Sequence, residues 1–455
     1  MRCGGQIFWH ESSITYACTS FHELRYDLTG ENVGVPHLMT YPILSGATTL
    51  RLRSLNPKES NQSDYYGSGF GVRTAACLWA AGKSWWQLSM REVAANPALT
   101  ADFARTLQGA IDHRPALTTT SWAAVVGDCS QEVSAFGGVD AAGEPTSIST
   151  WFDLASLTKV LVTVPLALEL VGKGVLDPEE PLADLLPDAG WQWMGDDCHL
   201  GTATLLDLLS HSAGVAATEP IYSWGTSSEQ AIARILHASS TPQQSWSDGI
   251  RRGTGYSDLG YLIAGEVMSA VTQQTFQALA LNFVKDTGIQ EISYGVDADR
   301  NSVAPMGYCR FRKRELVGTV HDLNAASLGG VTPHAGLFGT LAGVQKALEY
   351  LQETETFGVV SKLRSTPDPV RQPRQTSRGL GWELPCAAWS RGTYVLPRGI
   401  CHIGSTGTSV WIDHDGAHQI LLTNRTGFLN EGYVKAVDGL RRVFAAVSDG
   451  LLVDR

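Results

Sequence analysis

A serine and a lysine, Ser156 and Lys159, lie three residues apart at the start of a helical pattern. Three residues make about one helical turn, so the two side chains share one face. A serine at that position gains from the positive end of the helix dipole. A lysine that is partly withdrawn from water can accept or relay the hydroxyl proton. This chemistry would make Ser156 a nucleophile that Lys159 assists.

Two further segments follow this pair along the chain. The first is GTGYSDLGY at 253–261, and the second is CHIGSTGT at 401–408, directly before a β-rich run. With the segment FDLASLTK at 152–159, they resemble the three motifs of the serine β-lactamase and penicillin-binding protein superfamily. They are most similar to its class C-like branch of β-lactamase-related serine hydrolases and esterases.

Other segments extend this resemblance over roughly residues 100 to 450, but not over the first hundred residues. They are LLSHSAG at 208–214, VHDLNA at 320–325, HAGLFG at 334–339 and LTNR at 422–425.

The resemblance implies a role for each matched residue. Ser156 would form the acyl-enzyme, and Lys159 would help to deprotonate it. Tyr256 would be the second base, or the acid that protonates the leaving group. Its phenolate would need nearby positive charge, because an unperturbed tyrosine pKa is about 10. The oxyanion hole would use the backbone N–H groups of Ser156 and Ser405.

The resemblance also implies substrate contacts at Asp258, His402 and Gly404, and here the chain departs from the family pattern. Asp258 stands where the family usually has asparagine, which places an anion near Lys159. His402 stands where β-lactamases have lysine, and a histidine is neutral or only partly charged near pH 7. Ile403 replaces a threonine whose hydroxyl would help to hold a carboxylate. These departures argue against efficient β-lactam hydrolysis.

We therefore expect a serine hydrolase that acts through an acyl-enzyme on small esters or amides, with an ester as the leading substrate. The alternatives are a β-lactamase or a D-amino-acid peptidase. An alternative of another class is a catalytically weak binding or regulatory module that works through the N-terminal region. Retention of serine, lysine and tyrosine together argues against that alternative.

The pattern of strands and helices favours an α+β protein. We expect one antiparallel sheet completed by sequence-distant segments and flanked by helices, with a helical insertion, as in the β-lactamase/transpeptidase-like fold. The expected strands are 122–126, 133–136, 408–413 and 419–423, the last two joined as a hairpin by His414, Asp415 and Gly416. The expected helices are 96–114, one that begins near Ser156, and 433–448 with Val434, Val437, Leu440, Phe444 and Val447 on one face.

Length and composition limit the class of protein. The 455 residues are 43% hydrophobic and 17% charged, which excludes disorder and coiled coil. A net charge of −11 argues against a nucleic-acid partner. The chain has no basic and apolar leader pattern and no membrane-length apolar run, so we expect a cytoplasmic protein without a membrane partner. The oligomeric state stays open.

The remaining expectations concern domains, cysteines and metals. Residues 1–100 form an unassigned N-terminal region, and 101–455 form the hydrolase domain. The eight cysteines include no CxxC pair, so we expect reduced thiols. His211 and His334 lack metal-ligand spacing and are expected to be hydrogen-bonded structural residues, so no metal or other cofactor is expected.

Overall fold

The computed structural model describes sixteen segments of the chain, which form two compact units. The described residues are 5–10, 13–18, 22–27, 97–127, 132–187, 200–225, 228–238, 245–247, 250–252, 255–354, 356–362, 364–366, 376–385, 399–413, 415–426 and 431–452. Unit 1 comprises Met1–Thr118, Val125–Ala135 and Leu429–Arg455, and unit 2 comprises Thr119–Ala124 and Phe136–Phe428.

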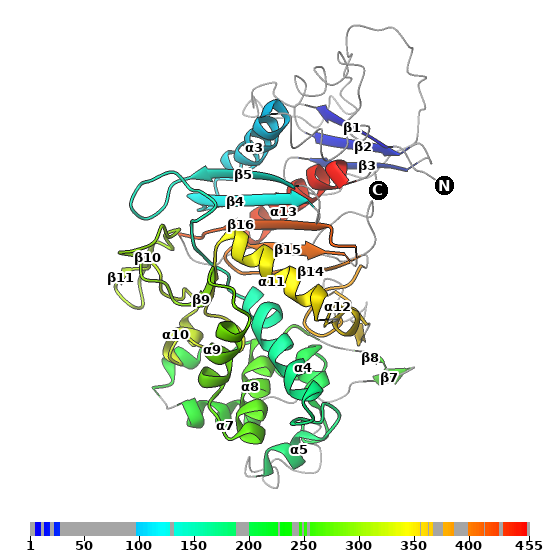
Figure 1. Ribbon diagram of the computed structural model, residues 1–455, viewed down its shortest axis with the longest axis vertical. Helices are drawn as coiled ribbons and strands as arrows, with labels where there is room; N and C mark the ends of the chain where they lie inside the picture. The colour runs from blue at the N-terminus through cyan, green and yellow to red at the C-terminus, as the bar shows by residue number, and fades with distance from the viewer. Residues whose placement is uncertain are drawn as a thin grey trace, which may run out of the picture. The chain divides into compact units, whose positions relative to one another are not determined.

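The strands and helices keep the labels of Figure 1. The strands are β1 (Gly5–His10), β2 (Ser13–Cys18), β3 (His22–Asp27), β4 (Ser121–Gly127), β5 (Glu132–Gly138), β6 (Phe152–Asp153), β7 (Ser245–Ser247), β8 (Ile250–Arg252), β9 (Ile292–Tyr294), β10 (Tyr308–Cys309), β11 (Arg314–Glu315), β12 (Leu337–Gly339), β13 (Ser365–Thr366), β14 (Ile400–Ile403), β15 (Ser409–Ile412) and β16 (His418–Thr423). The helices are α3 (Pro97–Asp112), η2 (Lys159–Thr163), α4 (Val164–Gly172), α5 (Leu182–Leu185), α6 (Leu205–Leu209), η5 (Ile221–Ser223), α7 (Ser228–Ala238), α8 (Asp258–Thr272), α9 (Phe276–Asp286), α10 (Leu323–Ser327), α11 (Leu341–Glu353), α12 (Thr356–Val360) and α13 (Glu431–Leu452).

The largest described sheet has the strand order β14-β15-β16-β4-β5, so strands from the end of the chain pair beside strands from near residue 130 (Figure 1). β14, β15 and β16 run antiparallel, with Ile403 opposite Ser409 and Ser409 opposite Leu421. The expected hairpin is confirmed. Its turn contains Gly416 at φ 86°, a left-handed conformation that glycine adopts without strain. His414 of that turn lies outside the described residues.

Polar caps fix where the helices of unit 2 begin. Ser257 caps α8 by accepting a hydrogen bond from the N–H of Gly260 at 2.9 Å. Thr275 caps α9 and Thr340 caps α11 in the same way. α11 packs against β16, and α6, α7 and α9 each contact α8. Helices thus flank the sheet, and the expected α+β fold with a helical insertion is confirmed.

Unit 1 contains the sheet β1-β2-β3 and the helices α3 and α13. The two helices meet through Phe103 and Phe444, whose ring centroids are 6.2 Å apart. Both helices were expected, but Val434 is 40% exposed, so its assignment to the buried face of α13 was wrong. A domain boundary near residue 100 stays a prediction.

Candidate active site

Ser156 follows a strained turn rather than a regular helix start. Ala155 has φ 47°, a left-handed conformation that costs free energy for a residue with a Cβ. Its N–H donates to Oδ1 of Asp153 at 2.8 Å, and the backbone N–H of His321 donates to Oδ2 at 2.7 Å. The Thr158 hydroxyl donates to the Ala155 carbonyl at 2.6 Å. These bonds hold the turn that presents Ser156.

Asp153 is the buried anchor of this turn. Burial raises its pKa to about 6, although the N–H groups of His321 and Ala155 lower it. The Thr406 hydroxyl donates to the Asp153 carbonyl at 2.9 Å. Asp153 therefore joins the turn that precedes Ser156 to the segment that follows β14.

Lys159 lies at the start of the π-helical turn η2, with its side chain fully buried. Its Nζ lies 3.2 Å from Ser156 Oγ, 2.7 Å from Asp258 Oδ1 and 2.9 Å from the His334 carbonyl. An ammonium group has three donors, which is enough to bind these three acceptors. Burial lowers the pKa of Lys159, but Asp258 and Tyr256 outweigh burial and raise it above its usual value. Lys159 is therefore an ammonium ion at neutral pH.

The ring of Tyr256 lies beside Lys159, whose Nζ is 5.0 Å from the ring centroid. The pKa of Tyr256 lies above its usual value, because burial raises it most and Asp258 raises it further. The charge of Lys159 and hydrogen bonds to Lys159 and Ser156 lower it. Tyr256 is therefore a neutral phenol at neutral pH, in contact with both members of the Ser156 pair.

Two histidines border Tyr256. The His211 ring lies 4.4 Å from the Tyr256 ring, centroid to centroid, and the His402 ring lies 6.2 Å away. His211 Nδ1 accepts the N–H of Ser257 at 3.0 Å. Burial, with the charges of Arg378 and Lys159, holds the pKa of His211 well below its usual value. His211 is therefore a neutral, hydrogen-bonded ring, as expected for a structural histidine.

The end of β14 lies against the turn that precedes Ser156 because position 404 is glycine. A Cβ on Gly404 would come within 2.2 Å of Thr408 Oγ1 and 2.9 Å of the Leu154 carbonyl, so no other residue fits. The next residue, Ser405, is exposed. Among the described residues, the backbone N–H groups of Ser156 and Ser405 donate to no acceptor. Both are thus open to an incoming oxygen atom.

The three expected substrate contacts differ in their surroundings. Asp258 binds Lys159 and keeps its side chain 25% exposed. The His402 side chain is buried, and Gly404 is buried against Leu154 and Ala155. Among these three positions, only Asp258 combines a side-chain polar group with partial exposure. The sequence analysis placed this anion near Lys159, and the structure shows the two side chains as an ion pair.

Several residues at the site were missed by the sequence analysis. Asp153 lay inside the quoted motif, but no spacing rule indicated that it anchors the turn. The His334 carbonyl binds Lys159, while its ring lies between Thr332 Oγ1 at 3.1 Å and Asp322 Oδ1 at 3.3 Å. Arg378, whose guanidinium carbon is 5.2 Å from the Tyr256 ring centroid, gave no sequence signal.

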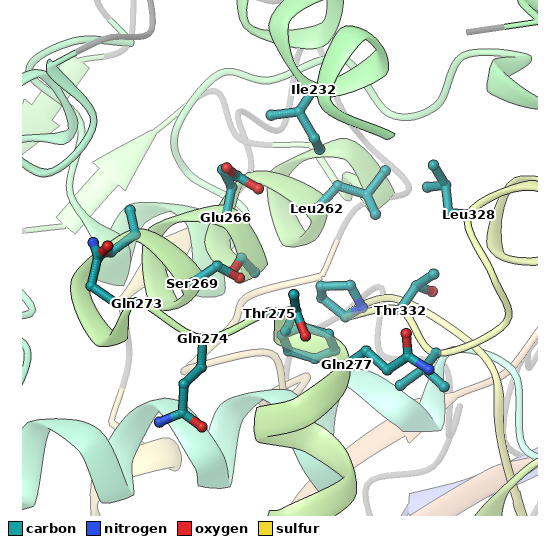
Figure 2. Close-up of a pocket in the computed structure, with 15 residues that line it drawn as sticks. Ile232, Leu262, Glu266, Ser269, Gln273, Gln274, Thr275, Gln277, Leu328 and Thr332 are labelled. Atoms are coloured by element: carbon teal, nitrogen blue, oxygen red, sulfur yellow. The ribbon is translucent and has the colours of Figure 1, made fainter. Parts of the chain in front are cut away.

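A cavity of about 550 Å³ lies along the C-terminal part of α8, and none of the expected catalytic residues lines it. Figure 2 shows side chains from α8, including Leu262 and Ser269, and from the start of α9, including Gln277. The segment 331–333 forms another wall, and the next residue is His334.

The described parts of the chain contain no cluster of three or more histidine, cysteine, aspartate or glutamate side chains suited to a metal ion. In those same parts, no helix has both the length and the apolar character needed to cross a membrane.

Comparison with known proteins agrees with this geometry. The family model "Beta-lactamase" matches residues 105–437. A putative D-alanyl-D-alanine carboxypeptidase of Escherichia coli K12 is 27% identical over 299 residues, covering 58% of this chain and 66% of that protein. The chain thus spans slightly less than two thirds of that relative.

Two solved structures share the fold. A class C β-lactamase from Rhodobacter sphaeroides has a TM-score of 0.52 at 17% identity, covering 74% of this chain and 97% of that one. A D-alanine carboxypeptidase from Burkholderia cenocepacia has a TM-score of 0.54 at 18% identity, covering 76% and 99%. Because the family model covers well over half of the chain, this protein belongs to the β-lactamase family, within the serine β-lactamase and penicillin-binding protein superfamily.

Proposed function

We propose that this protein is a serine hydrolase that cleaves small uncharged esters, and more slowly amides, through an acyl-enzyme on Ser156. One observation carries the proposal. A buried ammonium group, Lys159 Nζ, lies 3.2 Å from Ser156 Oγ and is held there by Asp258 and the His334 carbonyl. A buried charge is costly unless it is paired. The Lys159 ammonium group is paired with Asp258 and also lies within hydrogen-bond distance of the Ser156 hydroxyl.

Because both pKa values are raised, Lys159 and Tyr256 have different roles in the reaction. Because Lys159 is an ammonium ion, we assign it to charge stabilisation and Tyr256 to proton transfer. Tyr256 first loses its hydroxyl proton to solvent, and the resulting phenolate takes the proton of Ser156 Oγ as Oγ bonds to the substrate carbonyl carbon. Tyr256 then returns this proton to the leaving oxygen as its bond to the acyl carbon breaks. In the second step, Tyr256 takes a proton from the water molecule that attacks the acyl carbon. It then gives this proton to Ser156 Oγ as the Oγ–acyl bond breaks, which releases the acid and restores the Ser156 hydroxyl.

The negative oxygen of the tetrahedral intermediate needs donors that have no other acceptor. The backbone N–H groups of Ser156 and Ser405 meet that requirement among the described residues, and we assign the oxyanion hole to them.

The end of β14 favours a substrate without a carboxylate. A carboxylate bound by a fixed cation or hydroxyl gains charge-assisted hydrogen bonds of roughly 1.5–3 kcal/mol each. Ile403 supplies neither group, and the neighbouring His402 is buried. An uncharged ester loses nothing at these positions.

A second candidate is a D-amino-acid carboxypeptidase, which the names of the E. coli relative and of the B. cenocepacia structure favour. Both names refer to enzymes that act on a substrate ending in D-alanine. This activity needs a group that binds the terminal carboxylate. The substrate panel below therefore separates the two candidates.

The test is one purified sample assayed with p-nitrophenyl acetate, p-nitrophenyl butyrate, a chromogenic cephalosporin and a D-Ala-D-Ala peptide. We expect kcat/KM for the esters to exceed that for the cephalosporin by at least about tenfold, which corresponds to about 1.4 kcal/mol. Ile403→Thr should narrow this gap by restoring a hydroxyl, and His402→Lys should narrow it further. Peptide turnover faster than ester turnover would favour the carboxypeptidase instead.

A further inference from the structure

A second buried ion pair lies beside Tyr256. Arg378 and Glu383 are 6% and 2% exposed, and Arg378 Nη2 lies 3.3 Å from Glu383 Oε1. Arg378 Nη1 donates to the Gly381 carbonyl at 3.0 Å. The guanidinium carbon lies 5.2 Å from the centroid of the Tyr256 ring, close to the 5.0 Å of Lys159 Nζ. Tyr256 therefore has two buried cations over its ring.

The backbone around Arg378 fixes the guanidinium in place. Glu383 and Cys401 of β14 exchange both backbone hydrogen bonds, at 2.8 and 3.0 Å, and the Cys401 thiol donates to Glu383 Oε2 at 3.6 Å. Gly381 has φ 78°, and a Cβ there would come within 2.7 Å of the Tyr261 hydroxyl. Arg378 therefore stays beside Tyr256, in a segment that is hydrogen-bonded to β14.

The charges around Tyr256 include an anion, so a second cation such as Arg378 can help to stabilise the phenolate. The polar and charged side chains around Tyr256 include Ser156, Lys159, His211, Asp258, Tyr261, Arg378 and His402. Lys159 is paired with Asp258, whose carboxylate opposes formation of the phenolate. His211 is neutral. The charge of Arg378 does reach the neighbouring Tyr261, where it lowers the pKa against a larger effect of burial.

We propose that Arg378 is a positioning residue whose guanidinium offsets the Asp258 carboxylate and stabilises the phenolate of Tyr256. The inference rests on the proposed function, because it concerns the base that accepts the Ser156 proton. Without Arg378, Tyr256 would lose its hydroxyl proton to solvent only at a higher pH.

The experiment is the pH dependence of kcat/KM with p-nitrophenyl acetate, from pH 6 to 10.5, for the parent and a set of variants. An opposite charge within about 4–6 Å lowers the pKa of an acid by roughly 1–3, and the Arg378 guanidinium carbon lies 5.2 Å from the centroid of the Tyr256 ring. Arg378→Met should therefore move the rising limb, along which activity increases as Tyr256 loses its proton, upward by about 1 pH unit and lower kcat about tenfold at pH 7.5, with little change in KM. Arg378→Lys keeps the charge and should recover most of the rate.

Asp258→Asn should move the limb in the opposite direction, to lower pH, because it removes the opposing anion. Adding Arg378→Met to Asp258→Asn should bring the limb back toward the parental position. Arg378→Met leaves Glu383 buried without its partner, so the double variant Arg378→Met/Glu383→Leu is measured as well and should show the same upward shift. Arg300→Met, at an exposed arginine, is the matched control and should leave the limb unchanged.

Each outcome bears on one of the two proposals. If the folded Arg378 variants lose rate equally at every pH and the limb does not move, Arg378 is merely structural and the inference is wrong. If the parent hydrolyses the ester but Ser156→Ala does so equally fast, the proposed function is wrong and the role of Arg378 falls with it. A limb that moves downward in Arg378→Met would contradict the inference while leaving the proposed function intact.

Discussion

The two ends of helix α8 lie in different physical environments. At its N-terminal end, Asp258 binds the buried ammonium of Lys159, and Tyr256 lies two residues before it. At its C-terminal end, Ser269 and the exposed Gln273 line an open cavity (Figure 2). One helix thus carries a buried cluster of charges at one end and a cavity lined by both polar and apolar side chains at the other.

This difference shows where the sequence is least free to change. Removing one member of a buried ion pair leaves an uncompensated charge, which typically costs 3–5 kcal/mol. A substitution at an exposed polar position usually changes stability by no more than about 0.5 kcal/mol. We therefore expect large effects on turnover at the N-terminal end of α8 and small ones at the cavity.

The largest expected effect is that of Ser156→Ala. Without the nucleophile, the proton-transfer groups and oxyanion donors have no covalent step to assist, so kcat should fall by roughly 10³-fold or more. Ester hydrolysis and the thermal unfolding midpoint are the measurements. Ser269→Ala, which removes a hydroxyl at the cavity end, is the control and should keep parental turnover. Near-parental turnover by Ser156→Ala would contradict the expected difference between the site at the N-terminal end of α8 and the cavity at its C-terminal end.

The next effect concerns Lys159 and Tyr256 as a coupled pair. Lys159→Met and Tyr256→Phe should each lower kcat by roughly 10²-fold or more, far more than they raise KM. The double variant should cost less than the sum of the two losses in activation free energy, because groups that act as a unit are not additive. A double-mutant cycle in steady-state kinetics measures this, and strict additivity would show that the two residues act separately.

Asp153 extends the comparison to stability. Its folded pKa of about 6 lies above the usual 3.8, so its contribution to folding is fully present below pH 3.8 and is lost as the pH rises through 6. The loss is on the order of 3 kcal/mol. Urea unfolding of the parent and of Asp153→Asn should therefore show a difference in unfolding free energy, parent minus variant, that decreases between pH 4 and 7. A difference that increases over this range would contradict the assignment.

The smallest expected effect lies at the cavity. Gln277→Ala, at an exposed residue of the cavity wall, should leave kcat within about twofold of the parent and the unfolding free energy within about 0.5 kcal/mol. The measurements are the ester assay and urea unfolding. A loss as large as that of Lys159→Met would show that the cavity is part of the catalytic machinery.

Local patterns in the sequence predicted the elements that depend on local interactions. The alternation and turn residues predicted the β15–β16 hairpin, and apolar periodicity predicted α3 and α13. The spacing of Ser156 and Lys159 also predicted that their side chains would meet, as they do at 3.2 Å. These features are set by residues close together in the chain, so a single sequence contains enough information to find them.

Contacts between distant segments could not be predicted in this way. Arg378 reaches Tyr256 because Glu383 pairs with Cys401 on β14, and the His334 carbonyl reaches Lys159 only after the chain has folded. A backbone carbonyl carries no sequence signal at all. The exposure of Val434 has a similar origin, since periodicity gives the face of a helix but not how widely that face is covered.

The most direct test of the nucleophile is covalent labelling of the intact protein with a fluorophosphonate, followed by peptide mass spectrometry. If Ser156 forms the acyl-enzyme, the parent should gain the mass of one phosphonyl group, mapped to the peptide that contains Ser156. Ser156→Ala should gain none, and Ser269→Ala should label like the parent. A label mapped to any other residue, or equal labelling of Ser156→Ala, would contradict the assignment.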